Sequence, residues 1–146
     1  MAGSAIAAGT LALCLNSMGA GGAPIQSVAP LDATSPAFTL TWMHSIEKTQ
    51  WQEYWQVVTS PKPHLRLVSA RIETSGAGME IPDNAVWRNG GYDYTVNQDL
   101  DSVTLSHSPF TQQAQLCVGQ DCRLLSNWLP GLPNIQAVTL APCHAP

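Results

Sequence analysis

The chain has 146 residues, of which 11% are charged, and its formal net charge at pH 7 is −4. A chain of this length forms a single domain with a real hydrophobic core. Its six basic residues are scattered along the sequence, so nucleic acid is not an expected partner. With so few charges, the fold has to depend on the burial of apolar and aromatic side chains beneath a neutral polar surface.

Residues 1–22 are typical of a signal-peptide-like leader. No charged side chain occurs in residues 1–31, and the apolar run 5–15 is followed by small residues. That run is shorter than the roughly 20 residues of a membrane span, but it has the length of a signal-peptide core. The signal is weak, because the α-amino group is the only positive charge before it. We expect export to the periplasm or another extracytoplasmic compartment. Residues 23–37 would form a flexible lead-in, in which 24–31 could add an edge strand.

Residues 38–143 are predicted to form one all-β domain. Apolar and polar residues alternate with a period of two, and no long window has helical spacing. Clusters of Pro, Gly, Asn and Asp separate about eight short strands. The predicted strands are 38–44, 51–60, 64–75, 92–97, 102–107, 113–118, 121–126 and 135–140. Such a series predicts a compact antiparallel β-sandwich or a small β-barrel.

The first predicted hairpin carries a histidine and a carboxylate on an aromatic face. With a loop over 45–50, His44 would lie opposite Trp51 and Trp42 opposite Glu53, all on one sheet face. His44 and Glu53 would then be diagonal neighbours, and the carboxylate would favour the protonated imidazole or fix its tautomer. In one interpretation, the pair contacts a ligand or takes part in catalysis. In the other, it is a structural ion pair. A slip of one residue in the register would separate them.

The second informative segment is a glycine-rich turn that ends in an acidic residue: Ser75, Gly76, Ala77, Gly78, Met79 and Glu80. Its backbone N–H groups could bind an anion. The glycines could equally serve a turn or bulge that needs a positive φ. Arg71 precedes the turn on the same strand and alternates with Ala70 and Ile72, so it points away from their face. It could neutralise one of the nearby glutamates or remain solvated.

The two segments together resemble the signature of the domain of unknown function 1850 family. The resemblance rests on His44-Ser45-x-Glu47, Trp51-x-Glu53-x-Trp55 and Gly76-Ala77-Gly78-Met79-Glu80, and it covers roughly residues 38–143. Members of that family are small extracytoplasmic bacterial proteins, usually encoded beside TAXI-type tripartite (TRAP) transporters. The resemblance therefore implies a transporter partner, either the membrane subunit or the substrate-binding protein. It implies no established activity.

An enzymatic function has weaker support in the residues. Ser45 follows His44 directly, so the two would point to opposite faces of a strand, and the chain lacks a Gly-x-Ser-x-Gly elbow. Ser45 fits better as the first residue of the loop. A metal site is the better catalytic alternative, since imidazole and carboxylate ligands could come from His44, Glu47, Glu53 and Glu80. No recognised ligand spacing supports it, and we predict no metal or other cofactor.

Two of the four cysteines are predicted to form a disulfide across a hairpin. Gly119-Gln120 suits a two-residue type II′ turn, which places Cys117 opposite Cys122 at a separation that a disulfide can close. A metal site with Cys143 and His144 is the competing interpretation. Cys14 would be lost with the leader, which leaves Cys143 unpaired unless it displaces one of the other two.

The sequence thus predicts an exported accessory or ligand- and partner-binding domain linked to a TAXI-type TRAP transporter. A small periplasmic hydrolase, including a metal-assisted one that uses His44 and nearby glutamates, is the alternative. The candidate contact residues for a partner or a small-molecule ligand are His44, Ser45, Glu47, Glu53, Arg71, Ser75, Gly76, Gly78, Met79 and Glu80.

Overall fold

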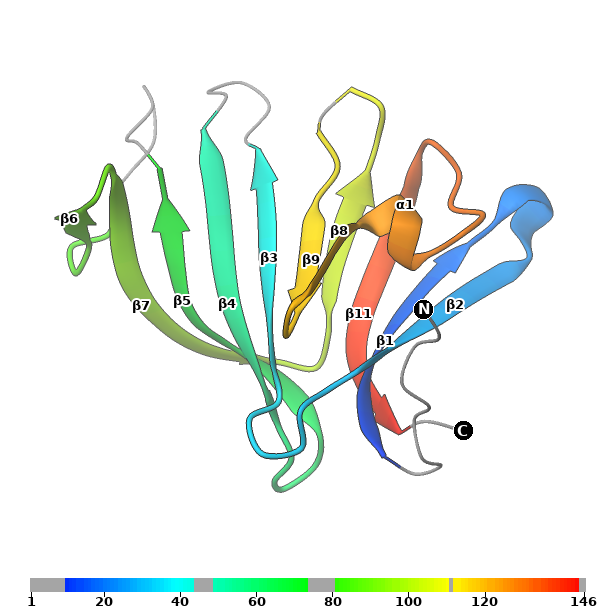
Figure 1. Cartoon of the computed structure of the whole chain (residues 1–146), viewed down its shortest axis with the longest axis horizontal. Coiled ribbons are helices and arrows are strands. Elements are labelled where there is room, and N and C mark those ends of the chain that lie inside the picture. The colour runs from blue at the N-terminus through cyan, green and yellow to red at the C-terminus, as the bar shows by residue number, and fades with distance from the viewer. Residues whose placement is uncertain (1–9, 44–48, 74–80, 111, 145–146) are drawn as a thin grey trace.

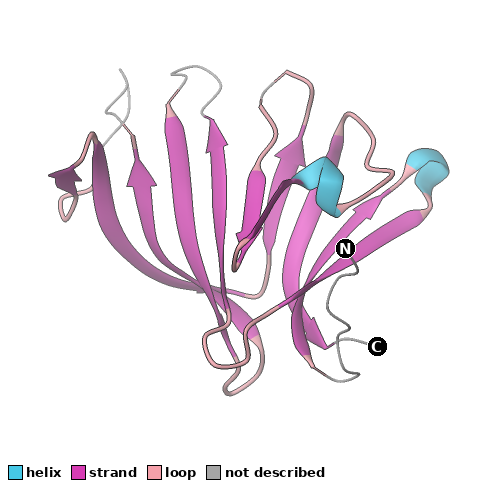
Figure 2. Cartoon of the chain, in the orientation of Figure 1, coloured by secondary structure: helices cyan, strands magenta, loops and turns pink. Residues whose placement is uncertain are grey.

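The computed structural model describes residues 10–43, 49–73, 81–110 and 112–144, which form two antiparallel sheets (Figure 1). One sheet has seven strands in the order β10-β9-β3-β4-β5-β7-β6, and the other has four in the order β2-β1-β11-β8. Of the described residues, 61% lie in strands and 6% in helices, which confirms the predicted all-β sandwich (Figure 2). The elements are β1 (Leu11–Met18), η1 (Ala20–Gly22), β2 (Pro24–Pro30), β3 (Ala37–Met43), β4 (Gln50–Val58), β5 (His64–Ile72), β6 (Val86–Arg88), β7 (Gly91–Leu100), β8 (Val103–His107), β9 (Gln115–Val118), β10 (Asp121–Leu124), α1 (Leu125–Trp128) and β11 (Gln136–His144).

All eight strands expected from residue 38 onward are present, with ends that shift by a few residues. The conditional edge strand over 24–31 is β2, which lies at one edge of the four-stranded sheet. The sequence analysis did not predict β1 or the three-residue strand β6. Among the described residues, no helix is long and apolar enough to cross a membrane.

Strand β1 lies within residues 1–22, the segment that the sequence predicts to be a leader. It lies between β2 and β11 and pairs with both along its length. Ala12, Leu13 and Leu15 are fully buried, so this apolar run contributes directly to the core. A chain that begins at residue 23 would lack β1, and β2 would then have no neighbour in the sheet. The leader over residues 1–22 stays a prediction.

Two disulfides are present. Cys14 on β1 is bonded to Cys143 on β11, so Cys143 is not the unpaired residue that the leader interpretation implied. Cys117 and Cys122 form the second bond, with Cys117 opposite Cys122 and Val118 opposite Asp121, as the hairpin analysis predicted. Gly119 has the positive φ of 61° that the turn requires. All four cysteines are used, so these residues provide no thiolate ligands for the alternative zinc site.

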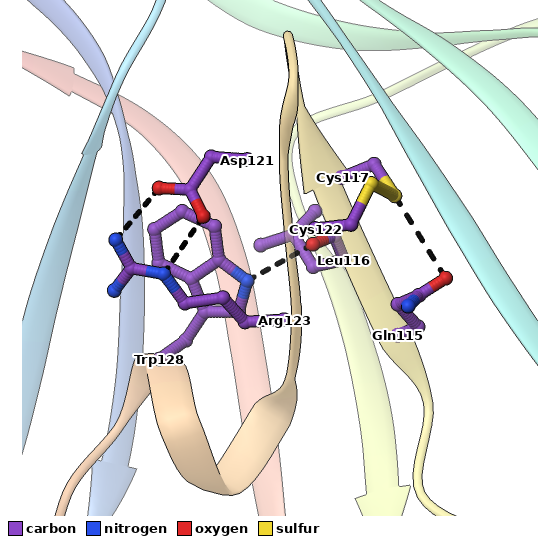
Figure 3. Close-up of a disulfide and its surroundings, with 7 residues drawn as sticks. All are labelled: Gln115, Leu116, Cys117, Asp121, Cys122, Arg123 and Trp128. Carbon is purple, nitrogen blue, oxygen red and sulfur yellow. Dashed lines mark hydrogen bonds and ion pairs between the residues drawn. A yellow bond between two sulfur atoms is a disulfide. The ribbon is translucent and has the colours of Figure 1, made fainter.

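The core fills the space between the two sheets. Leu13, Leu15, Val138 and Leu140 come from the four-stranded sheet. The larger sheet supplies Phe38, Leu40, Trp55, Val57, Leu65, Leu116 and Val118, and the α1 region adds Leu125, Trp128 and Leu129. Helix α1 is held in place by Trp128, whose indole Nε1 donates a hydrogen bond to the carbonyl of Leu116 at 3.0 Å (Figure 3). Arg123 stacks over the Trp128 ring at 4.2 Å and pairs with Asp121 (Figure 3).

A β-bulge divides the larger sheet into two regions. The partners of β5 change register between Leu67 and Ser69, on both the β4 and the β7 side, so that Val68 has no partner in either ladder. Before the bulge, Leu65 and Leu67 face the core, and after it Ala70 and Ile72 take the inner face. Ala70 and Ile72 are buried, yet they do not belong to the core cluster shared with the four-stranded sheet. Beyond the bulge, the inner face of β5 therefore lies outside this cluster.

Burial of β1 predicts that its core side chains contribute to stability. We expect Leu13→Ala to lower the free energy of unfolding by about 2–5 kcal/mol, because it opens a cavity beneath the sheet. Asn16→Ala, on the same strand but exposed, should cost less than about 1 kcal/mol. Urea denaturation of the full chain measures both values. Equal stability of Leu13→Ala and the parent would show that residues 11–18 are not part of the fold.

The two disulfides should differ in their contribution to stability. Cys14 and Cys143 are 129 positions apart in sequence, whereas Cys117 and Cys122 are five apart. The loop-closure model gives about 5 kcal/mol for the long loop and about 2 kcal/mol for the short one. We therefore expect the pair of substitutions Cys14→Ala and Cys143→Ala to lower the melting temperature more than Cys117→Ala and Cys122→Ala. The opposite order would contradict the entropic account.

Candidate functional site

The first row of the candidate site is aromatic and crosses five strands of the larger sheet beyond the bulge. Consecutive cross-strand partners share a face, and those in this row are Trp42, Trp51, Ile72, Tyr92 and Trp87. We call these five residues the aromatic row. Trp42 and Trp51 stack with ring centroids 5.8 Å apart, and Trp87 meets Tyr92 edge-on at 4.9 Å. Both separations lie in the range of favourable aromatic pairs.

The second row brings a carboxylate onto the same face. Its members, again cross-strand partners, are Leu40, Glu53, Ala70 and Tyr94. Trp55 follows Glu53 on the same face of β4, and its indole Nε1 donates a hydrogen bond to Glu53 Oε1 at 3.2 Å. Burial raises the pKa of Glu53 above its ordinary value, and the Trp55 hydrogen bond opposes this shift in part. Glu53 is therefore a half-buried acid in apolar surroundings.

Tyr94 is electrostatically linked to Glu53. Burial raises the pKa of the Tyr94 phenol, and the negative charge of Glu53 raises it further. The two side chains belong to β7 and β4, with the small side chain of Ala70 on β5 between them. Tyr94 thus stays neutral near physiological pH, and its ring and hydroxyl belong to the surroundings of the Glu53 carboxylate.

The register predicted for this hairpin is wrong by two positions. Trp42, and not His44, lies opposite Trp51, while Glu53 lies opposite Leu40. The connection still has six residues but spans 44–49 instead of 45–50. A shift of two positions keeps every side chain on its predicted face, so Trp51, Glu53 and Trp55 do share one face. The argument that placed Glu53 diagonal to His44 is lost, and His44 itself lies outside the described residues.

Arg71 does not neutralise Glu53. It points to the opposite face from Ala70 and Ile72, as predicted, and there Nη1 bonds Asp93 at 3.1 Å. Its Nη2 donates to the carbonyls of Arg88 and Asn89 at 3.0 and 2.7 Å. A Cβ on Gly91 would come within 2.8 Å of the guanidinium, so glycine is needed beside it. Arg71 therefore anchors the β6–β7 turn, which is a structural role.

The two motif segments leave the sheet at one common end. Glu73 N donates to the Gln50 carbonyl at 3.0 Å, and Gln50 N donates to a carboxylate oxygen of Glu73 at 3.2 Å. The ends of β3 and β5 and the start of β4 therefore meet at this end of the sheet (Figure 1), where Trp42, Trp51 and Ile72 also lie. We call this the motif end of the sheet. The remaining candidate contacts lie outside the described residues: His44, Ser45, Glu47, Ser75, Gly76, Gly78, Met79 and Glu80.

No arrangement of side chains in the described part of the chain supports the catalytic alternative. Of its four suggested metal ligands, Glu53 alone falls within the described ranges. In those same ranges, no three His, Cys, Asp or Glu side chains are grouped closely enough to hold a metal ion. Around Glu53, the described neighbours are Leu40, Trp51, Trp55, Ala70 and Tyr94, and none of them is a base.

Comparison with known families supports the resemblance. The family described as "Domain of unknown function (DUF1850)" matches residues 38–125. The chain belongs to this family. No curated protein and no solved structure matches the chain.

The DUF1850 match runs from the second residue of β3 to the first residue of α1, and so it includes the seven-stranded sheet apart from Ala37. It contains both rows of the candidate site and both motif segments. Strands β1, β2 and β11, which complete the second sheet, lie outside the match. Two disulfides are compatible with an oxidising, extracytoplasmic compartment.

Sequence reasoning found Glu53 but missed Tyr94 near it, as well as Tyr92 and Trp87 on the same sheet face. The strand containing both tyrosines was predicted, but neither was assigned to the hairpin face. Their link to Glu53 depends on the order β4-β5-β7-β6, which hydrophobic periodicity does not encode. One available signal was the change of phase along β5. Leu65 and Leu67 are odd-numbered, whereas Ala70 and Ile72 are even-numbered, as expected when a bulge intervenes.

The position of Glu53 makes stability depend on pH in a specific direction. Because the pKa of Glu53 is raised in the folded state, the folded state binds a proton more tightly than the unfolded state. Its contribution to stability is therefore largest at low pH and falls as the pH rises from the ordinary glutamate value through the folded pKa.

Carboxyl NMR titration of Glu53 should give a midpoint above the model-peptide value, and Trp55→Phe should raise this midpoint further. In Glu53→Gln this titration step is absent, and the loss of stability as the pH rises above the ordinary glutamate value should be smaller. A midpoint at or below the ordinary value would contradict the described burial.

Proposed function

We propose that this protein is an exported accessory domain of a TAXI-type TRAP transporter, and that it binds the membrane subunit or the substrate-binding protein. The observation that carries the proposal is the pair of rows beyond the bulge. There the inner face of a DUF1850 domain presents aromatic rings and one half-buried carboxylate at the motif end, next to the core cluster that includes Leu40 and Trp55. Exposed aromatic surface with a polar group at its edge is typical of contact sites.

The aromatic and charged side chains in these rows are only partly covered, whereas Leu40, Ala70 and Ile72 are buried. Trp42, Trp51, Glu53, Tyr92 and Tyr94 are all of intermediate exposure, and Trp87 is 56% exposed. Such side chains can exchange solvent for a partner without unfolding the domain. The transporter identity and the periplasmic location come from the family resemblance. The candidate contacts proposed from the sequence, apart from Glu53 and Arg71, lie outside the described residues and stay predictions.

A charge-matched pair of variants tests the proposed binding surface. The neighbouring transporter subunits are purified, and their binding to the full chain is measured by biolayer interferometry. We expect Glu53→Gln to weaken binding at least tenfold, because it removes the one charge of the two rows, an effect of about 1.4 kcal/mol or more. Asp101→Asn removes an exposed carboxylate in the β7–β8 turn and should bind like the parent.

The controls separate binding from folding. Both variants should melt within a few degrees of the parent, since neither removes a core side chain. If no transporter subunit binds the parent chain, the accessory role is wrong. If the two variants bind equally well, the partner uses another surface.

A further inference from the structure

The charge of Glu53 has no counter-ion among the described residues. The four arginines pair with aspartates elsewhere: Arg66 with Asp99, Arg71 and Arg88 with Asp93, and Arg123 with Asp121. Lys62 lies in the β4–β5 connection, at the end of the sheet away from the motifs. Within the described ranges, the indole of Trp55 is the one hydrogen-bond donor to this carboxylate, and it reaches Oε1 alone.

A half-buried carboxylate that has no counter-ion within the described ranges lowers the stability of the domain that carries it. Removing a charge from water costs free energy unless a partner replaces the lost hydration. Nearby, apolar Leu40 and Ala70 flank Glu53 across the sheet, while Trp51 and Trp55 flank it along the strand. None of these neighbours supplies positive charge. A cationic ligand would supply it, whereas an anionic ligand would be repelled.

The surrounding rings favour the same class of ligand. Indole and phenol faces attract cations through their quadrupoles, most strongly where water is partly excluded. Trp51 is stacked on Trp42 and shares a face with Glu53 two positions along β4, while Tyr94 lies within electrostatic reach of the carboxylate on the other side. A carboxylate between aromatic rings is the chemistry that recognises organic ammonium and guanidinium groups.

We propose that Glu53, with Trp42, Trp51 and Tyr94, binds an ammonium or guanidinium group at the motif end of the larger sheet. This inference rests on the proposed function, in that it gives the same surface a ligand chemistry. The group belongs either to a small organic amine or to a Lys or Arg side chain of a protein partner. In both cases, the carboxylate provides the charge contact and the rings provide the cation–π contacts.

The first experiment uses small probes with the full, oxidised chain. Methylammonium, tetramethylammonium and methylguanidinium chlorides are titrated while the indole N–H signals are followed by NMR. Sodium acetate is the anionic control, and tert-butanol is the neutral control of similar shape to tetramethylammonium. We expect saturable binding of the cations in the millimolar range, as the few atoms of each probe allow. Neither control should saturate.

Variants assign the binding to the site. Glu53→Gln should weaken cation binding at least tenfold, and Asp101→Asn should leave it unchanged. Trp42→Leu should weaken tetramethylammonium several-fold, because it removes a ring while it keeps the charge. Equal binding of the cations to Glu53→Gln and the parent, or binding of acetate or tert-butanol as tight as that of the cations, would overturn the assignment.

The pH dependence provides a second readout. Binding should weaken as the pH falls through the pKa of Glu53, since the protonated acid has no charge to offer. The described side chains that face Glu53 are Leu40, Trp51, Trp55, Ala70 and Tyr94, of which Tyr94 alone titrates, well above this range. Saturating cation should in turn lower the midpoint of Glu53. An unchanged midpoint would place the bound cation elsewhere.

A final comparison separates the two sources and the two proposals. Lysine acetylation and arginine modification of the transporter subunits should abolish their binding if a partner side chain supplies the cation. These treatments should have no effect if the ligand is a free amine. Cation binding that depends on Glu53, without any transporter contact, would retain this site and reject the accessory role. Transporter binding that depends on Glu53, without affinity for any cationic probe, would retain the accessory role and reject the cation site.

Discussion

The structure depends on the inequality of its two sheets. A four-stranded sheet cannot cover the whole inner face of a seven-stranded one. Part of the larger sheet's inner face therefore lies outside the packing between the two sheets. The bulge at Val68 marks the division, because it changes which residues of β5 point inward. On one side, leucines join the common core. On the other side, aromatic rings and one acid replace them, and this part of the sheet forms the proposed binding surface.

This division explains why a charge is tolerated on an inner face. Inside the shared core, Glu53 would need a paired cation or would stay protonated. At its actual position it keeps partial contact with solvent and accepts one indole hydrogen bond, so its pKa rises without the full cost of burial. Arg71 is the nearest basic residue in the pairing scheme, one position from Ala70, yet strand alternation directs it to the other face. The separation of these two charges is a direct result of the pleat.

Sequence periodicity recovered the strands from residue 38 onward because most of them alternate cleanly between an apolar and a polar face. It could not set the register of β3 against β4, since a shift of two positions leaves every face unchanged. The Trp42–Trp51 and Phe38–Trp55 stacks accompany the observed register. Strand β1 was missed because an uncharged apolar run near the first residue has the composition of a leader. The link between Cys14 and Cys143 was lost with it. Strand β6 has three residues and is defined by its pairing with β7, which local sequence does not encode.

The bond between Cys14 and Cys143 also changes what a protease can do to the molecule. It joins β1 to β11, the first and last strands of the described chain. A single cut in any connection between them yields two polypeptides that remain attached through the sulfur atoms. Such fragments stay at high local concentration and can re-form the sheets, in the way that a tethered pair binds more tightly than a free one. Under oxidising conditions, a nicked molecule would keep its mass and much of its structure, and only a reductant would reveal the cut.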